Sequence, residues 1–148
     1  MIKLNRTLGL LTLAVAVVMV GCEDEPNIDF DLTDAHVIDT RQRLHWGFAH
    51  VEGARHIDWD CIVIGMRHLG IEEHEPIVIY DQNESLARRA EVSLRNMSYL
   101  YVRNAGGLQD VQQLLDRPIV SPEDSTPTEV EQAIMAECEE RRALRPEL

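Results

Sequence analysis

The chain has 148 residues, of which 45% are apolar, so it is long enough and hydrophobic enough to form one folded domain. Its formal net charge is -12, which disfavours binding to the phosphate backbones of nucleic acids and to anionic lipid headgroups. We therefore expect no nucleic-acid partner, and attachment to a membrane would need something other than surface charge.

The N-terminal segment has the pattern of a bacterial lipoprotein signal. Lys3 and Arg6 give it a positive start, residues 8–20 are mostly apolar, and MVGC at 19–22 fits a lipobox ending in Cys22. The apolar stretch is shorter than the roughly 20 residues that a membrane-spanning helix needs. The pattern predicts cleavage before Cys22 and lipid on its thiol. A short membrane anchor, or an ordinary cleaved signal followed by a chance cysteine, are the alternatives.

Lipid on Cys22 would place the chain in the bacterial cell envelope. Residues 1–21 would be removed, and a diacylglycerol with a further acyl chain such as palmitate would anchor the chain stably, because several acyl chains hold where one does not. We expect the domain to face the periplasm. Glu23 is not the aspartate that favours retention in the inner membrane, so the outer membrane is the expected location. Residues 22–35 are acidic with little apolar content and are expected to form a tether.

From residue 36 onward, short apolar runs alternate with segments of helical spacing. The expected elements are a strand at 36–41, a helix at 42–49, a glycine-containing turn and extended piece at 50–57, a helix at 58–69, a strand at 77–80, a helix at 85–97, a strand at 99–103 and a helix at 108–115. A linker at 121–128 leads to a C-terminal helix that Thr128 and Glu131 open with capping-box spacing. This alternation predicts an α/β fold around a parallel sheet, with one domain at 36–118 and a linker and helix at 119–148.

A polar loop separates the strand at 77–80 from the helix that follows it. In open α/β sheets, ligands bind beyond the carboxyl ends of the strands, and the free N–H groups at a helix start favour anions. This loop, however, has two acids and no glycine, which is unusual for an anion site. Its residues are Asp81, Gln82, Asn83, Glu84, Ser85 and Leu86.

Three short motifs occur in the order and spacing of a known family. They are VIDTR at 37–41, HVEGA at 50–54 and NAGG at 104–107. With them, residues 35–116 resemble a single-domain rhodanese, most of all the small exported kind typified by phage shock protein E. The resemblance implies a rhodanese-like sandwich, with a central parallel sheet and helices on both faces. It also implies scaffold roles for the residues at motif positions, which are Asp39, Arg41, His50, Gly53, Gly106 and Gly107.

In that family a cysteine opens the loop after the central strand and takes a sulfur atom from thiosulfate as a persulfide. The matching position here is Asp81, and the glycine and basic residue usual in the loop are missing. A carboxylate cannot form a persulfide, because that chemistry needs a thiolate. It would also repel the negatively charged thiosulfate. Two like unit charges about 4 Å apart, at an effective dielectric of about 20, repel each other by about 4 kcal/mol. We therefore expect no catalytic residue and no cofactor, and a carboxylate that accepts hydrogen bonds from the N–H groups of its own loop.

On this interpretation the chain is a lipid-anchored rhodanese-like domain that does not catalyse sulfur transfer and acts as a binding or scaffolding module for an unidentified envelope protein. The main alternative is a thiosulfate sulfurtransferase of the exported type. A second alternative makes Asp81 and Glu84 an acid–base pair. A third is a metal site, although the spacing matches no zinc pattern and we expect no metal. The candidate ligands are His45, His50, His56, Asp58 and Asp60.

Two cysteines remain beyond Cys22. Cys61 and Cys138 would experience an oxidising periplasm, where disulfides form and persist. The sequence leaves open whether the two pair or are buried separately as small apolar side chains. Neither matches the family's catalytic position, because Cys61 precedes the strand at 77–80 and Cys138 lies beyond the domain.

Overall fold

The computed structural model describes residues 30–121 and 127–144. The expected signal peptide, the expected lipid attachment site at Cys22 and the first part of the expected acidic tether lie outside the described residues. Within the described ranges, no helix combines the length and apolar character needed to cross a membrane.

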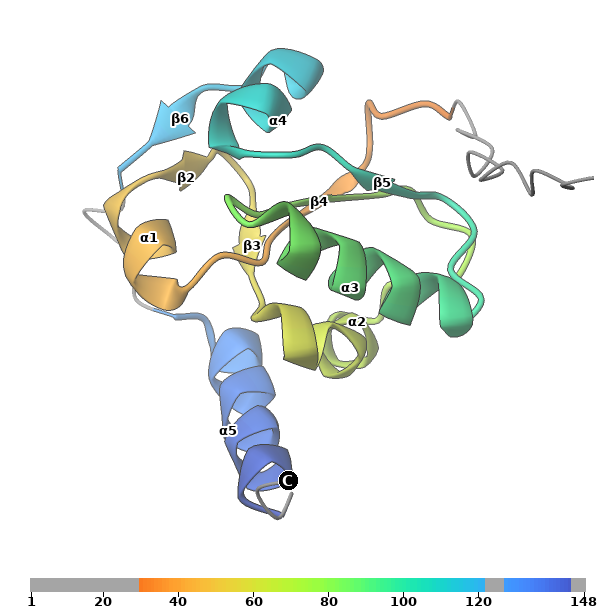
Figure 1. The fold of residues 1–148 in the computed structure, drawn as a ribbon, viewed down its shortest axis with the longest axis vertical. Helices are drawn as coiled ribbons and strands as arrows, with labels where there is room; N and C mark the ends of the chain where they lie inside the picture. The colour runs from red at the N-terminus through yellow and green to blue at the C-terminus, as the bar shows by residue number, and fades with distance from the viewer. Residues whose placement is uncertain (1–29, 122–126, 145–148) are drawn as a thin grey trace, which may run out of the picture.

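A parallel sheet of four strands forms the centre of the domain (Figure 1). Its order is β3 (Arg55–His56), β1 (His36–Asp39), β4 (Ile77–Tyr80) and β5 (Val102–Asn104). β1 and β4 pair along their whole length, with Val37 opposite Val78. The predicted parallel sheet is therefore confirmed, and the carboxyl ends of its two central strands lie next to each other.

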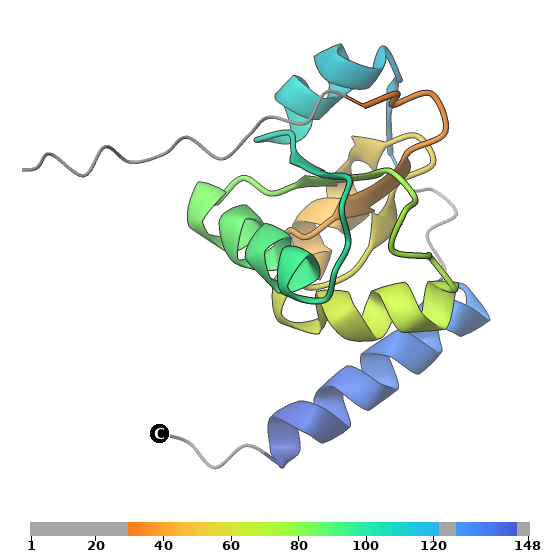
Figure 2. The same ribbon diagram turned by 90° about the vertical axis from the view of Figure 1, so that its right-hand side faces the viewer.

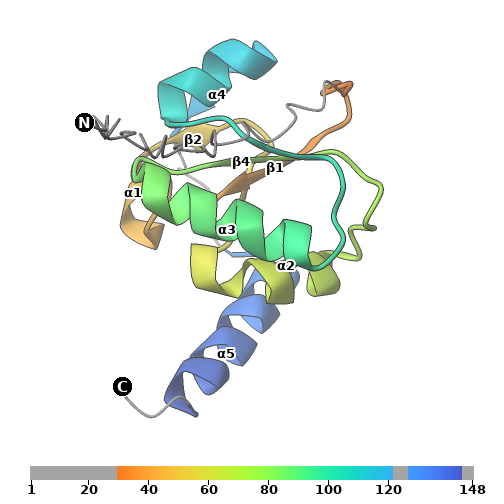
Figure 3. The same ribbon diagram turned by 45° about the vertical axis from the view of Figure 1, so that its right-hand side comes forward.

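Helices cover both faces of this sheet, as Figures 2 and 3 show. One face is covered by α2 (Ile62–Leu69) and α3 (Glu84–Asn96), which share an apolar core with the strands. The other face is covered by α4 (Leu108–Leu115), beside the small antiparallel sheet of β2 (His50–Val51) and β6 (Ile119–Val120). The sandwich with helices on both faces is thus confirmed.

The strands contribute apolar side chains to both cores, which is typical of a parallel sheet covered on its two faces. Ile38, Ile77 and Ile79 belong to the core beneath α2 and α3. Val78 and Tyr80 belong to the core beneath α4. All four residues of β4 are buried, so the loop that follows begins from the interior of the domain.

Some helices and strands end or begin where one residue adopts a left-handed backbone conformation. Gly70 ends α2 with φ +65, a left-handed conformation that glycine adopts without strain. The predicted helix at 58–69 is divided, because a turn of 3₁₀-helix, η1 (Trp59–Cys61), precedes α2. The strand expected at 99–103 begins later, at Val102. Before it, Ser98 has φ 69 and turns the chain out of α3.

The segment after α4 departs from the expected linker. Ile119 and Val120 form β6 and pair with β2, so the fold continues past residue 118. The last helix, α5 (Glu129–Ala143), begins with the predicted capping box, in which Thr128 Oγ1 accepts from the Glu131 N–H at 3.2 Å. It packs against α2 and extends away from the sheet (Figure 1).

Candidate functional site

The loop at 81–86 begins where β4 ends, next to the carboxyl end of β1. Asp81 is only 4% exposed, whereas residues 82–85 are exposed. The backbone N–H of Asp81 donates to the carbonyl of Gly106 at 2.9 Å, which ties the loop to the NAGG turn. The loop therefore opens with a buried acid at the edge of the sheet where α/β proteins bind ligands.

The Asp81 carboxylate accepts hydrogen bonds from two directions. One oxygen accepts from the backbone N–H of Asn83 at 2.8 Å, and the other accepts from the Thr40 hydroxyl at 3.1 Å. The side chain of Asn83 accepts from the N–H of Ser85 at 3.1 Å and caps α3. The sequence predicts that Asp81 accepts hydrogen bonds from several N–H groups of its own loop, but it accepts one, from Asn83. The N–H of Ser85 at the start of α3 donates to the side chain of Asn83 instead.

The two acids of the loop have different surroundings. Asp81 is buried between the ends of β1 and β4, whereas Glu84 is exposed at the first residue of α3. Thr40 and Asn83, which bond to Asp81, are neutral. This geometry lends no support to the hypothesis of an acid–base pair.

Asp39 and Arg41 form a buried ion pair beside the loop. Arg41 Nε and Nη2 donate to the two carboxylate oxygens at 2.6, 2.9 and 3.1 Å. Burial alone lowers the pKa of Arg41, but the hydrogen bonds and charge of Asp39 outweigh it, so this pKa is raised. Burial, with the charge of Asp39, also raises the pKa of Tyr80. The pair links the turn after β1 to its own strand end. The scaffold role that the resemblance implies for these two residues stays a prediction.

The motif glycines lie in turns around the site. Gly53 has φ +77 between β2 and β3, and Gly106 has φ +81 between β5 and α4. Asn104 Oδ1 accepts from the Gly106 N–H at 3.0 Å, and Asp110 accepts from the Gly107 N–H at 2.8 Å. These bonds shape the NAGG turn whose Gly106 carbonyl receives the Asp81 amide.

A cavity of about 490 Å³ lies between the loop, η1 and α5. We call it the carboxyl-end cavity. Three acids line it, Asp58, Asp60 and Asp81. Arg142 of α5 also lines it, with Nη2 2.8 Å from Asp58 and 2.6 Å from Asp60. Hydrogen bonds to Asp60 and Asp58 raise the pKa of Arg142. Sequence reasoning missed Arg142, because α5 lies outside the family motifs and its contacts join residues more than 80 positions apart.

A larger groove, of about 1240 Å³, lies on the other side of the loop along α3 and β5. Its charges are mixed, and the half-buried Arg95 donates to Glu91 at 3.1 Å. The groove therefore has no surplus of positive charge among its described lining residues. The charged residues that line it are Asp81, Glu84, Arg88, Glu91, Arg95, Arg103 and Asp110.

Asp58 and Asp60 both contact Arg142, and His56 Nε2 lies 3.6 Å from Asp58. Among the described residues, however, the five candidate metal ligands include no three whose ligand atoms all lie within 4.8 Å of one another. His45 Nδ1 lies 2.7 Å from the side-chain nitrogen of Gln82. His50 stacks on Trp46, with ring centroids 4.5 Å apart. His56 Nε2 lies 2.8 Å from the carbonyl of Arg41 and is buried. The three histidines therefore have separate structural partners.

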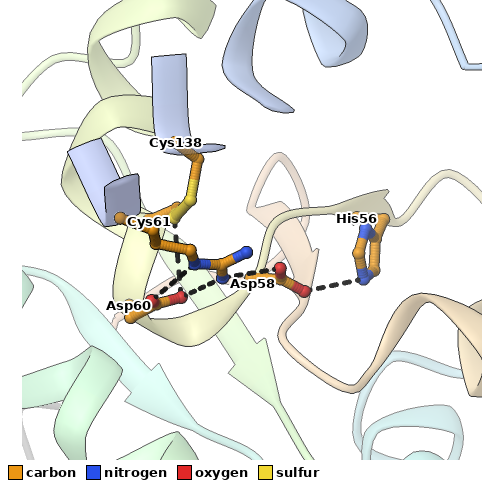
Figure 4. The surroundings of a disulfide bond; sticks show 6 residues. His56, Asp58, Asp60, Cys61 and Cys138 are labelled. Carbon is orange, nitrogen blue, oxygen red and sulfur yellow. Dashed lines mark hydrogen bonds and ion pairs between the residues drawn. A yellow bond between two sulfur atoms is a disulfide. The ribbon is translucent and has the colours of Figure 1, made fainter. Parts of the chain in front are cut away.

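Cys61 and Cys138 are joined in a disulfide (Figure 4). Their Cα atoms are 5.8 Å apart, which suits such a bond, and the bond links residues 77 positions apart. Both cysteines are also buried, at 2% and 3% exposed. Asp60 lies close enough to group with them as possible metal ligands, but paired sulfurs offer no thiolate to a metal.

The hydrogen bonds of Asp81 predict a clear order of stability for variants at this position. We expect Asp81→Ala to lower the free energy of unfolding by about 1–3 kcal/mol, because the Asn83 N–H and the buried Thr40 hydroxyl lose a charged acceptor. Asp81→Asn keeps an acceptor oxygen and should have a smaller effect. Denaturant titration of the three proteins measures the order. Equal stability of wild type and Asp81→Ala would mean that Asp81 is merely tolerated there.

No family model matches the chain, and no curated protein matches it in sequence. Several solved structures are similar in fold. A protein from Anabaena sp. matches with TM-score 0.53 and 21% identity, over 62% of this chain and 80% of its own. A Rhodanese_3 like domain of the same protein matches with TM-score 0.51 and 19% identity, over 58% of this chain and 98% of its own. A Helicobacter pylori protein matches with TM-score 0.50 and 16% identity, over 67% and 89%.

These identities are too low to carry an activity from one protein to another, but the similar structures cover most of their own length. Together with the strand order and the two covered faces of the sheet, they identify the rhodanese-like fold in this chain.

Proposed function

We propose that this protein is a lipid-anchored rhodanese-like domain of the bacterial envelope that binds or scaffolds another envelope protein and does not transfer sulfur. The observation that carries the proposal is the buried Asp81 at the first position of the loop after β4. The resemblance of the motifs places the family's sulfur-accepting cysteine at this position. A carboxylate there removes the nucleophile and leaves the fold available for binding.

The cysteines and charges of the domain support the same conclusion. Sulfur transfer needs a thiolate, and Cys61 and Cys138 are buried and joined to each other. Asp58, Asp60 and Asp81 line the carboxyl-end cavity against one arginine. Thiosulfate carries two negative charges and would be repelled by this surplus of carboxylates.

We expect no turnover of thiosulfate and cyanide by the purified protein, assayed beside an active rhodanese. Mass spectrometry after incubation with thiosulfate should show no gain of one sulfur atom on Cys61 or Cys138. Turnover together with such a gain would establish the alternative, a thiosulfate sulfurtransferase.

The membrane attachment in this proposal is testable separately at Cys22. We expect the membrane fraction to contain an N-terminal peptide that begins at Cys22 and carries a diacylglyceryl group and a further acyl chain. Cys22→Ala should accumulate as the uncleaved precursor, because lipoprotein processing acts before the modified cysteine. Normal processing and membrane association of Cys22→Ala would exclude the lipid anchor.

A further inference from the structure

We propose that α5 is a redox-controlled strap across the carboxyl-end cavity, which the Cys61–Cys138 disulfide closes and a dithiol reductant opens. The disulfide joins η1 to α5, and α5 also packs against α2. Four positions further along α5, Arg142 reaches the cavity and contacts Asp58 and Asp60. Figure 4 shows the disulfide with Asp58 and Asp60 near it.

The apolar contacts of α5 are sparse, so the covalent bond is its main anchor. Ile134 and Cys138 are the two buried residues of this helix. Val130 is 39% exposed and gives little further burial. One isoleucine and one cysteine bury less apolar surface than the two isoleucines and the methionine that α2 buries.

The remaining contacts of α5 lie near the surface. Arg43 donates to the sulfur of the half-buried Met135, and the others are ion pairs. Glu137 accepts hydrogen bonds from Arg67 and His68 of α2, and the side chain of Glu137 is 40% exposed. Arg142 is 45% exposed where it meets Asp58. Exposed pairs of this kind stabilise a contact weakly. They orient α5 while the disulfide is intact and are insufficient to hold it alone.

Release of α5 would change the cavity in two ways. Arg142 would leave its wall, which opens the space between the loop and η1. Asp58 and Asp60 would then add their negative charges to that of Asp81, without the guanidinium that now lies between them. The strap would therefore control access to the carboxyl-end cavity. That this access governs binding of a partner rests on the proposed function.

The redox step is ordinary thiol–disulfide exchange. One thiolate of the dithiol attacks a sulfur of the Cys61–Cys138 pair, the S–S bond breaks, and a mixed disulfide forms. The second thiolate of the dithiol then displaces the protein sulfur. Two electrons and two protons end on Cys61 and Cys138, and the dithiol becomes a disulfide. A crevice of about 50 Å³ lined by both cysteines lies beside the bond and offers an approach.

Hydrogen exchange of the full chain, with and without dithiothreitol, tests the strap. On reduction we expect the amides of residues 129–143 to exchange at least tenfold faster, while those of β1 and β4 keep their rates. Cys138→Ser should show the same fast exchange in α5 without reductant. Arg142→Gln in the oxidised protein is the matched control and should change exchange in α5 less than threefold, because the disulfide remains.

Two outcomes would overturn the proposal. Unchanged exchange in α5 after reduction would mean that noncovalent contacts suffice to hold it. Loss of protection in β1 and β4 as well would mean that the disulfide staples the whole domain. Because reduction of the wild-type chain is the primary measurement, the test does not depend on folding of a variant. It uses neither thiosulfate nor a partner, so its failure would leave the proposed function untouched.

Discussion

Asp39→Ala is expected to lower the free energy of unfolding by about 3–5 kcal/mol, the usual effect of removing one partner from a buried ion pair. Asp39 is fully buried, and Arg41 is 5% exposed. Without Asp39, the Arg41 guanidinium would keep its hydrogen bond to the carbonyl of Ala49 but would lose both carboxylate oxygens. An unpaired charge would then remain in the interior, at the turn that supports Thr40 and, through it, Asp81.

Denaturant titration at neutral pH measures this effect, with Asp34→Ala as the matched control. Asp34 is an exposed aspartate in a turn before β1, so its replacement should change stability by no more than about 0.5 kcal/mol. The double variant Asp39→Ala/Arg41→Ala should be less destabilised than the sum of the two single variants, because it leaves no unpaired charge. Additive losses would show that the two residues stabilise the domain independently.

Gly65→Ala is expected to lower the free energy of unfolding by about 1–3 kcal/mol through overpacking. Gly65 is buried in α2. A Cβ there would lie 2.4 Å from Ile57 Cδ1 and 2.8 Å from Ile57 Cγ2. Ile57 is 1% exposed and belongs to the main core, so its movement would disturb neighbouring core side chains. Relief of the clash would shift α2 against the segment that leads into η1, which forms one wall of the carboxyl-end cavity.

Gly47→Ala provides the matched control for this variant. Gly47 lies in α1 (Arg43–Phe48) and is exposed, and a Cβ there would meet no side chain of the described residues within 4 Å. Alanine costs less backbone entropy than glycine in a helix, so this change should be neutral or stabilising by about 0.5–1 kcal/mol. Thermal and denaturant unfolding compare the two variants. Equal losses at both positions would rule out steric conflict with Ile57 as the cause.

Patterns that depend on neighbouring residues predicted much of the fold. The apolar run at 77–80 became β4 at the same residues, and the helix expected at 108–115 has those bounds. The capping box of Thr128 and Glu131 is present. Strands covered on both faces leave a continuous apolar run in the sequence, and helices with one apolar face leave apolar residues at helical spacing. The division of 58–69 into η1 and α2 left no such signal.

The site was predictable only in part, for a related reason. The position of Asp81 at a strand end follows from the order of strand, loop and helix, and its contact with Asn83 spans two residues. Its second contact, with Thr40, depends on β1 lying beside β4. Which of the loop acids is buried was therefore decided by strand pairing.

The sequence by itself determined the α/β class, the polar loop after the central strand and the acid at its first position, since each depends on residue type and local spacing. Only the tertiary structure decided that Ile119 and Val120 join the fold, that Cys61 pairs with Cys138, and that Arg142 reaches the carboxyl-end cavity. These contacts join residues far apart in the chain, by 77 positions for the disulfide and by 84 for the contact of Arg142 with Asp58. Such pairings depend on how the helices pack in three dimensions, and no local preference of the chain encodes them.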